Sequence, residues 1–122
     1  MMKTTIIAVC GALIVAAAFL LAAPMKPKSV VHVITVQWKS DATPEQIAKA
    51  IKGVETMSYP GLKNVWTKPI KMQLPDGYKS IFVMEFESEQ ALKDYASSPA
   101  QKAWYDVYMP IREESRTSDI TN

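Results

Sequence analysis

The sequence predicts an α+β domain whose strands and helices follow in the order β-α-β-β-α-β. Residues 30–38 are rich in the β-branched and aromatic residues that favour strands. Two later stretches, 44–54 and 99–111, repeat apolar residues at helical spacing. A turn signal at 75–77 separates two further strand-like runs, which we expect to form a hairpin.

An apolar segment comes before the predicted domain. Lys3 is followed by a run from Ile6 to Ala23 that carries no charge. A basic start and an apolar core are typical of an export signal, and this run barely reaches the length that spans a bilayer. The sequence therefore predicts that residues 1–23 are a cleaved signal peptide or a membrane anchor, and leaves the two open. We expect a bacterial protein that is periplasmic or secreted, and tethered to the inner membrane through residues 4–23 if the segment is retained.

The first strand and helix follow a short linker. Residues 24–29 contain two prolines, which stiffen the chain. The strand is expected over Val30–Trp38. After a turn, Thr43 is a good N-cap, and Gln46 completes a T-x-x-Q capping box that starts the first helix.

The hairpin is expected from two strand-like segments, of which the second has the clearer strand pattern. Leu62–Met72 is the second strand candidate, but Pro69 cannot donate a ladder hydrogen bond, so an edge position or a bulge is expected there. Tyr78–Phe86 is the third strand and contains four large apolar residues between its ends.

The C-terminal part of the domain is predicted to be mainly helical. Ser88 caps a short helix that runs to about Ser97, and Pro99 starts a longer amphipathic helix. The polar segment Glu113–Thr121 is assigned as the last strand, although its own pattern supports that assignment weakly.

This order is the split βαβ, or ferredoxin-like, arrangement, with helices on one face of a four-stranded antiparallel sheet. The first strand carries apolar side chains on both faces, Val30, Ile34, Val36 and Trp38 on one and Val31 and Val33 on the other. A strand with two apolar faces is covered on both, and a domain of about a hundred residues lacks the chain to cover the second. We therefore expect a two-fold homodimer.

Composition excludes several functional classes. The 14 basic and 12 acidic residues give a formal net charge of +2, without the basic excess that nucleic-acid binding normally needs. The only cysteine, Cys10, lies in the apolar segment, so the folded part has no disulfide and no thiol nucleophile. The only histidine is His32, which excludes a zinc site of the usual N/S type. Neither a metal nor a cofactor is expected.

Two interpretations of His32 stay open. Histidine changes charge near neutral pH without help, so His32 is a candidate for proton transfer, with Glu85, Asp94 or Asp106 as acidic partners that the fold could bring near. A strand histidine with a satisfied hydrogen bond is the commoner case. The same choice applies to Tyr95, which is either a ligand-facing group or a packing residue.

Four stretches, VVHVITVQWK, YPGLKNV, DGYKSIFVMEFESEQALKDYASSPAQKAW and SDIT, occur here in an order and spacing that resemble the stress-responsive dimeric α/β barrel family. The resemblance covers residues 30–121, and it implies a dimer whose two sheets form a barrel. It implies little about activity. A polyketide cyclase of the family uses a His on the first strand, a Tyr on the second helix and a second His after an x-P-A segment. His32 and Tyr95 match the first two, but the third falls on Gln101, whose amide cannot transfer a proton.

The sequence therefore predicts an exported A/B barrel domain, residues 30–122, that forms a homodimer and binds a small apolar ligand without an assigned activity. The alternative is a cofactor-free lyase, cyclase or oxygenase acting on a small aromatic or polyketide-like compound. A purely structural dimer is the third reading. The catalytic candidates are His32 and Tyr95, and the expected pocket residues are Ile34, Trp38, Phe82, Gln101 and Trp104.

Overall fold

The computed structural model describes residues 28–122. The predicted export segment, residues 1–23, and most of the linker lie outside the described residues. The elements are β1 (Val30–Trp38), α2 (Pro44–Glu55), β2 (Leu62–Trp66), β3 (Ser80–Phe86), α3 (Glu89–Tyr95), α4 (Pro99–Tyr108), a 3₁₀ turn η1 (Met109–Ile111) and β4 (Arg112–Thr121).

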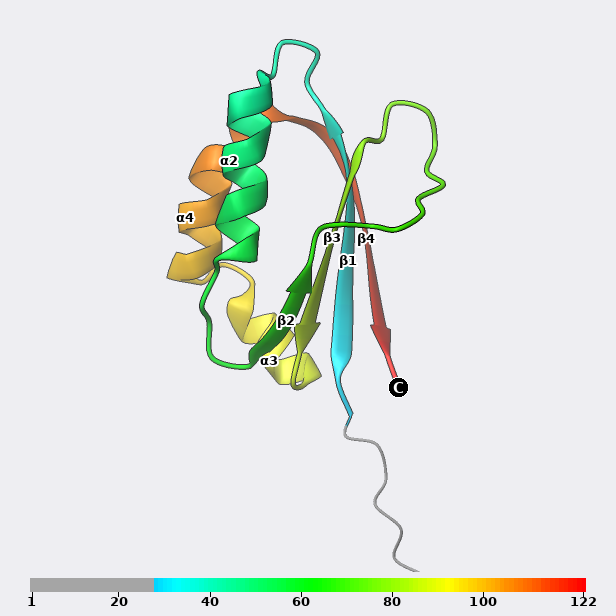
Figure 1. Cartoon of the computed structure of the whole chain (residues 1–122). Coiled ribbons are helices and arrows are strands. Elements are labelled where there is room, and N and C mark those ends of the chain that lie inside the picture. Colours follow the sequence, from blue (N-terminus) through cyan, green and yellow to red (C-terminus); the bar gives the residue numbers. More distant parts are fainter. Residues whose placement is uncertain (1–27) are drawn as a thin grey trace, which may run out of the picture.

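The four strands form one antiparallel sheet in the order β2-β3-β1-β4. The helices α2, α3 and α4 all lie on one side of the sheet, and its other side is not covered by any element of residues 28–122 (Figure 1). This is the ferredoxin-like α+β arrangement, and it confirms the fold class that the order of elements predicted.

The helices begin where the sequence places good caps. The side chain of Thr43 accepts a hydrogen bond from the backbone N–H of Gln46 at 3.2 Å, and the Gln46 side chain accepts one from the Thr43 N–H at 2.9 Å. These two bonds are the predicted capping box. The hydroxyls of Ser88 and Ser98 accept bonds at the N-termini of α3 and α4 in the same way.

Three strands differ from their predicted extents, and β3 begins at Ser80 rather than Tyr78. β2 ends at Trp66 rather than Met72, and residues 67–79 form a loop. Pro69 explains the early end, because it has no N–H for the ladder. The last strand is ten residues long, Arg112–Thr121, and pairs with β1 along its whole length.

The core lies between the helices and the sheet. Val36, Phe82, Met84 and Phe86 point from β1 and β3 towards the helices and are completely buried. Trp104 of α4 stacks on Tyr108 at 4.3 Å with nearly parallel rings, and meets Phe82 edge-on, so aromatic side chains fill the centre of this layer. Within residues 28–122 there is no helix with the length and apolar character needed to cross a bilayer.

Candidate functional site

A pocket of about 410 Å³ lies between the beginning of β1, the end of β4 and the α3–α4 region. Figure 1 shows α3 at the same end of the sheet as the C-terminus of the chain. The helix beside it, α3, has only seven residues and ends in a turn before α4 starts. The residues that bear on its chemistry are His32, Leu92, Tyr95, Gln101 and Asp119.

His32 is paired with a carboxylate from the neighbouring strand. The register of β1 and β4 places Asp119 directly opposite His32, and His32 Nδ1 lies 2.5 Å from Asp119 Oδ1. The histidine side chain is 15% exposed and the aspartate side chain 50%. A carboxylate on Nδ1 fixes the ring and favours the tautomer with its proton on that nitrogen. Nε2, which has no hydrogen-bond partner within residues 28–122, is then a free acceptor.

Asp119 is a residue of the candidate site that the sequence did not point to. The acidic partners proposed for His32 lie elsewhere: Glu85 accepts a bond from Asn64 at 2.7 Å, Asp94 accepts one from Gln90 at 2.8 Å, and Asp106 of α4 lies outside this pocket. A signal was available in the predicted topology. If the last strand pairs antiparallel with the first, Asp119 falls within a residue or two of the position opposite His32.

Tyr95 is the last residue of α3 and has only 1% of its surface exposed. Its ring packs against Phe86 at 5.2 Å and Tyr59 at 5.6 Å between centroids. Its hydroxyl is buried and has no hydrogen-bond partner among the described residues. Burial raises the pKa of Tyr95 well above the ordinary value of a tyrosine, and the nearby Tyr105 adds to this. The hydroxyl is therefore a proton donor across the physiological range.

Gln101 lines the same pocket, where the family resemblance would place a second histidine. Its side-chain oxygen accepts a hydrogen bond from the backbone N–H of Ser97 at 2.6 Å. Ser97 has a φ of 67°, which is unfavourable for a residue with a side chain. Gln101 thus braces the turn between α3 and α4, and it brings no titratable group to the pocket.

The other expected pocket residues lie in the core instead. Ile34 and Phe82 are buried beneath the helices, and Trp38 packs on Phe82 and donates its indole N–H to Ser80. Trp104 donates its indole N–H to the Ala50 carbonyl and borders a separate groove between α2 and α4. The difference arises because aromatic side chains fill the helical layer over the second half of β1. Of the seven predicted residues, His32, Tyr95 and Gln101 share the pocket.

One imidazole and one phenol belong to the residues that line the pocket, whose walls are mostly apolar, and the phenol oxygen itself is buried. It has room for a small molecule with a polar group beside His32. In residues 28–122, no three His, Cys, Asp or Glu side chains gather as a metal site would require.

A family model described as "Stress responsive A/B Barrel Domain" matches residues 30–122. The chain is 30% identical over 87 residues to the stress-response A/B barrel domain-containing protein HS1 of Arabidopsis thaliana, covering 64% of this chain and 75% of that protein. It is 29% identical over 97 residues to olivetolic acid cyclase of Cannabis sativa, covering 76% and 96%. Among solved structures, a dimeric ferredoxin-like protein of unknown function from Thermobifida fusca has the same fold, with a TM-score of 0.68, 17% identity and coverage of 82% and 96%.

Proposed function

The chain belongs to the stress-responsive A/B barrel domain family, and from this premise we propose that it binds a small, largely apolar molecule in the pocket of His32, Tyr95 and Asp119. The Tyr95 hydroxyl carries the proposal. A buried hydroxyl without a partner destabilises a fold by about 1–3 kcal/mol. Tyr95 is one of the residues that line the pocket, so a ligand that displaces the side chains covering this buried hydroxyl could accept its hydrogen bond.

The pocket also restricts the class of ligand. Its volume of about 410 Å³ is at the small end of ligand sites. Val30, Leu92 and Ala96 provide apolar wall, while His32 and Tyr95 provide the polar groups. A small aromatic or polyketide-like compound with one hydroxyl or carbonyl group fits this combination of apolar walls and two polar side chains.

Cofactor-free proton transfer is the second candidate function, and the His32–Asp119 pair favours it. An imidazole that a carboxylate holds through Nδ1 can take a proton at Nε2, and Tyr95 can donate to the oxygen on which charge develops. This supports a lyase, cyclase or oxygenase with a single base. It does not support a cyclase that needs two histidines, because Gln101 stands at the second position.

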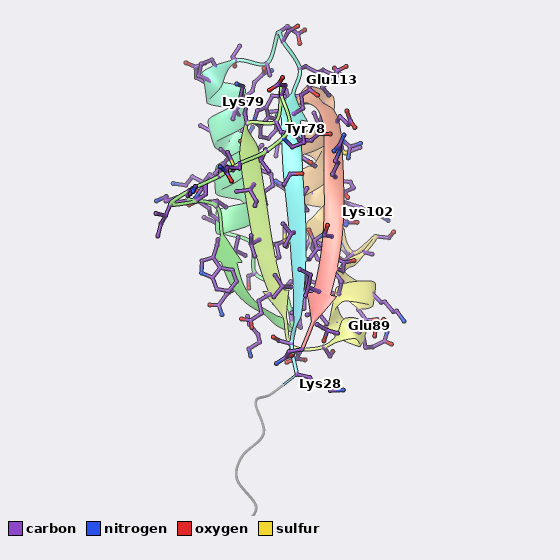
Figure 2. All side chains as sticks on the ribbon, turned by 90° about the vertical axis from the view of Figure 1, so that its right-hand side faces the viewer. Lys28, Tyr78, Lys79, Glu89, Lys102 and Glu113 are labelled. Carbon is purple, nitrogen blue, oxygen red and sulfur yellow. The ribbon has the colours of Figure 1, made fainter. Side chains whose placement is uncertain are left out.

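We also propose that the domain functions as a homodimer. The uncovered side of the sheet, which faces the viewer in Figure 2, carries Val31 and Val33 of β1, Ile81 and Val83 of β3, and Trp66 of β2. These side chains are only partly covered within one chain, and Trp66 is 50% exposed. The dimeric state of the Thermobifida fusca protein supports the same arrangement.

Export remains a prediction from residues 1–23 alone. It is tested by expressing the full chain in a bacterium with an envelope and fractionating the cells. The expected result is protein in the periplasm or the inner membrane, with N-terminal sequencing to decide between cleavage and retention. Recovery of the intact chain from the cytosol alone would contradict the export proposal.

Ligand binding is tested by thermal shift with a panel of small phenols and aromatic diketones. A compound that binds the pocket raises the free energy of unfolding of the wild-type protein by RT ln(1 + [L]/Kd), and its unfolding temperature rises as a result. We expect a smaller rise for Tyr95→Phe, which keeps the ring and loses only the donor, and for His32→Ala. Compounds that stabilise all three proteins equally would place the binding site elsewhere.

A further inference from the structure

We infer that the loop of residues 67–79, called here the β2–β3 loop, is a dimerisation arm that places Ile70 against a second copy of this chain. The inference rests on the proposed homodimer and adds to it a specific contact outside the sheet. Nothing in the packing of a single chain accounts for this loop's exposed apolar residue.

The loop is fixed at both ends. At its beginning, the hydroxyl of Thr67 donates to Glu55 of α2 at 3.1 Å. At its end, the backbone N–H of Lys79 donates to the Val36 carbonyl at 2.9 Å, and the Arg116 guanidinium lies 5.1 Å from the centre of the buried Tyr78 ring. These contacts hold both ends of the loop in place on the rest of the domain.

Between these ends the loop presents an apolar side chain to the outside. Ile70 is fully exposed, and Trp66, where β2 ends and the loop begins, is half exposed. One exposed apolar residue is ordinary on a protein surface. Two within five residues of the chain, at and just after the end of a strand with an uncovered apolar face, indicate an interaction surface.

Trp66 lies on the side of the sheet that the helices leave uncovered, and the loop that contains Ile70 projects on the same side. Trp66 is opposite Val83, whose neighbours Phe82 and Met84 point towards the helices, so Trp66 and Val83 point the other way. Figure 1 shows the β2–β3 loop projecting from the sheet on the side away from the helices. In Figure 2, where this side faces the viewer, Tyr78 lies in front of the sheet.

A second copy of the chain is the partner that fits this placement. Two sheets that pack face to face lie about 10 Å apart, so an arm that rises from one sheet meets the rim of the other. Two-fold symmetry repeats the contact, and each interface then contains two copies of Ile70. A lipid surface is the other partner that an apolar tip between Lys68 and Lys71 would fit, but the loop projects on the side of the apolar sheet face, which favours the second copy.

The test is a dilution series of the full-length chain in mild non-ionic detergent, followed by sedimentation velocity. Ile70→Asp should raise the dimer dissociation constant by about tenfold or more, as expected for removing a buried apolar anchor from an interface. Gln73→Asp is the matched control, because it adds the same charge to an exposed polar position of the same loop, and it should dimerise like wild type. Val33→Asp, at the centre of the sheet face, should abolish the dimer.

The possible outcomes separate the two proposals. A wild-type protein that stays monomeric at the highest concentration overturns the homodimer and the arm together. A wild-type dimer that Val33→Asp disrupts and Ile70→Asp leaves unchanged overturns the arm alone, and leaves a lipid surface as the partner for Ile70. Because Ile70 makes no contact that buries it within one chain, Ile70→Asp should keep the wild-type circular dichroism spectrum.

Discussion

At the scale of single residues, His32 depends on Asp119 for its chemistry. The carboxylate lies on the adjacent strand, and it holds the ring by Nδ1 while Nε2 stays free. The pair resembles the base–orienter arrangement of many catalytic sites, in which the carboxylate sets the tautomer of the histidine. Whether the pair acts as a base can be measured before any natural substrate is known.

The first prediction uses nitrobenzisoxazole, a small aromatic compound that opens when a base removes its ring C–H proton. The proton goes to His32 Nε2, the N–O bond breaks, and a coloured cyanophenolate is released. His32→Ala should lower the rate of the protein-catalysed reaction by about a hundredfold or more, the usual contribution of a general base. Asp119→Asn should lower it by about tenfold, because an amide no longer favours the productive tautomer.

Glu89→Gln provides the control for this assay, because Glu89 is another carboxylate at the same pocket. It should react at the wild-type rate. Equal rates for Asp119→Asn and wild type would show that Asp119 does not position the base. Equal rates for His32→Ala and wild type would remove His32 from any catalytic role.

The second prediction concerns Tyr95 and alkaline pH. Burial raises its pKa in the folded protein, so the folded state keeps a proton that the unfolded chain releases above about pH 10. The stability that this group contributes is therefore complete below about pH 10 and is lost as the pH rises beyond it. Denaturant midpoints measured at about pH 8 and about pH 11 should fall less for Tyr95→Phe than for wild type.

Tyr108 is also buried and its pKa is also raised, mainly by that burial, so part of the alkaline loss should remain in Tyr95→Phe. Near neutral pH, Tyr95→Phe should be neutral or stabilising, because it removes a buried hydroxyl that has no partner among the described residues. The same alkaline loss in both proteins would mean that the Tyr95 hydroxyl is not buried from solvent.

At the scale of elements, α2 packs tightly against α4 at Gly53. A Cβ atom at this position would lie 2.9 Å from Cδ1 of Trp104. The indole cannot move away easily, because its N–H donates to the Ala50 carbonyl at 2.9 Å and its ring stacks on Tyr108. The helix therefore contains a glycine where its propensity alone would favour alanine.

The third prediction follows from the competition of these two effects. Gly53→Ala should gain about 1 kcal/mol of helix propensity and lose about 1–3 kcal/mol through overpacking, so the net change should be destabilising. Urea unfolding measures the sum. Lys52→Ala, at an exposed position of the same helix, should leave the free energy of unfolding nearly unchanged. A gain in stability for Gly53→Ala would mean that the Trp104 side chain moves aside to make room for the added methyl group.

The sequence predicted the elements best where local signals are strong. Thr43 with Gln46, Ser88, and Pro99 mark helix starts by chemistry that acts within a few residues. β4 gave a weak signal because it is an edge strand that is exposed along nearly all its length, so neither face needs apolar residues. Its assignment came from the order of the other elements and from the family resemblance.

The site was harder to predict than the fold. His32 and Tyr95 stand out as residue types. The position of the pocket along the helix-facing side of β1, however, depends on where aromatic side chains of the helices fill the space. Trp104 and Tyr108 fill the layer over the second half of β1, and no local pattern reveals that. Asp119 lies 87 residues from His32, so only the register between β1 and β4 joins them.

At the scale of the whole molecule, the two sides of the sheet have different roles. The helical side encloses the core and holds the pocket at one end. The other side is partly apolar and is not covered within residues 28–122, although every strand of a stable sheet normally buries its apolar face. The pocket and the proposed dimer interface therefore lie on opposite faces of one sheet and share the strand β1.

The fourth prediction is that thermal stability depends on protein concentration. If the folded state is a dimer, its unfolding temperature rises with concentration by mass action. Calorimetry over a hundredfold range of concentration should show a steady increase for wild type and none for Val33→Asp. A constant unfolding temperature for wild type would contradict the dimer and leave the apolar side of the sheet unexplained.

The central claim is that His32 and Tyr95 form one end of a ligand pocket. A crystal structure of the wild-type protein with nitrobenzotriazole, a stable mimic of the assay compound, tests it most directly. The predicted result is the compound between α3 and the β1–β4 pair, with its ring nitrogens within hydrogen-bond distance of His32 Nε2 and the Tyr95 hydroxyl. Binding in the groove between α2 and α4, with the His32 pocket left empty, would contradict the claim.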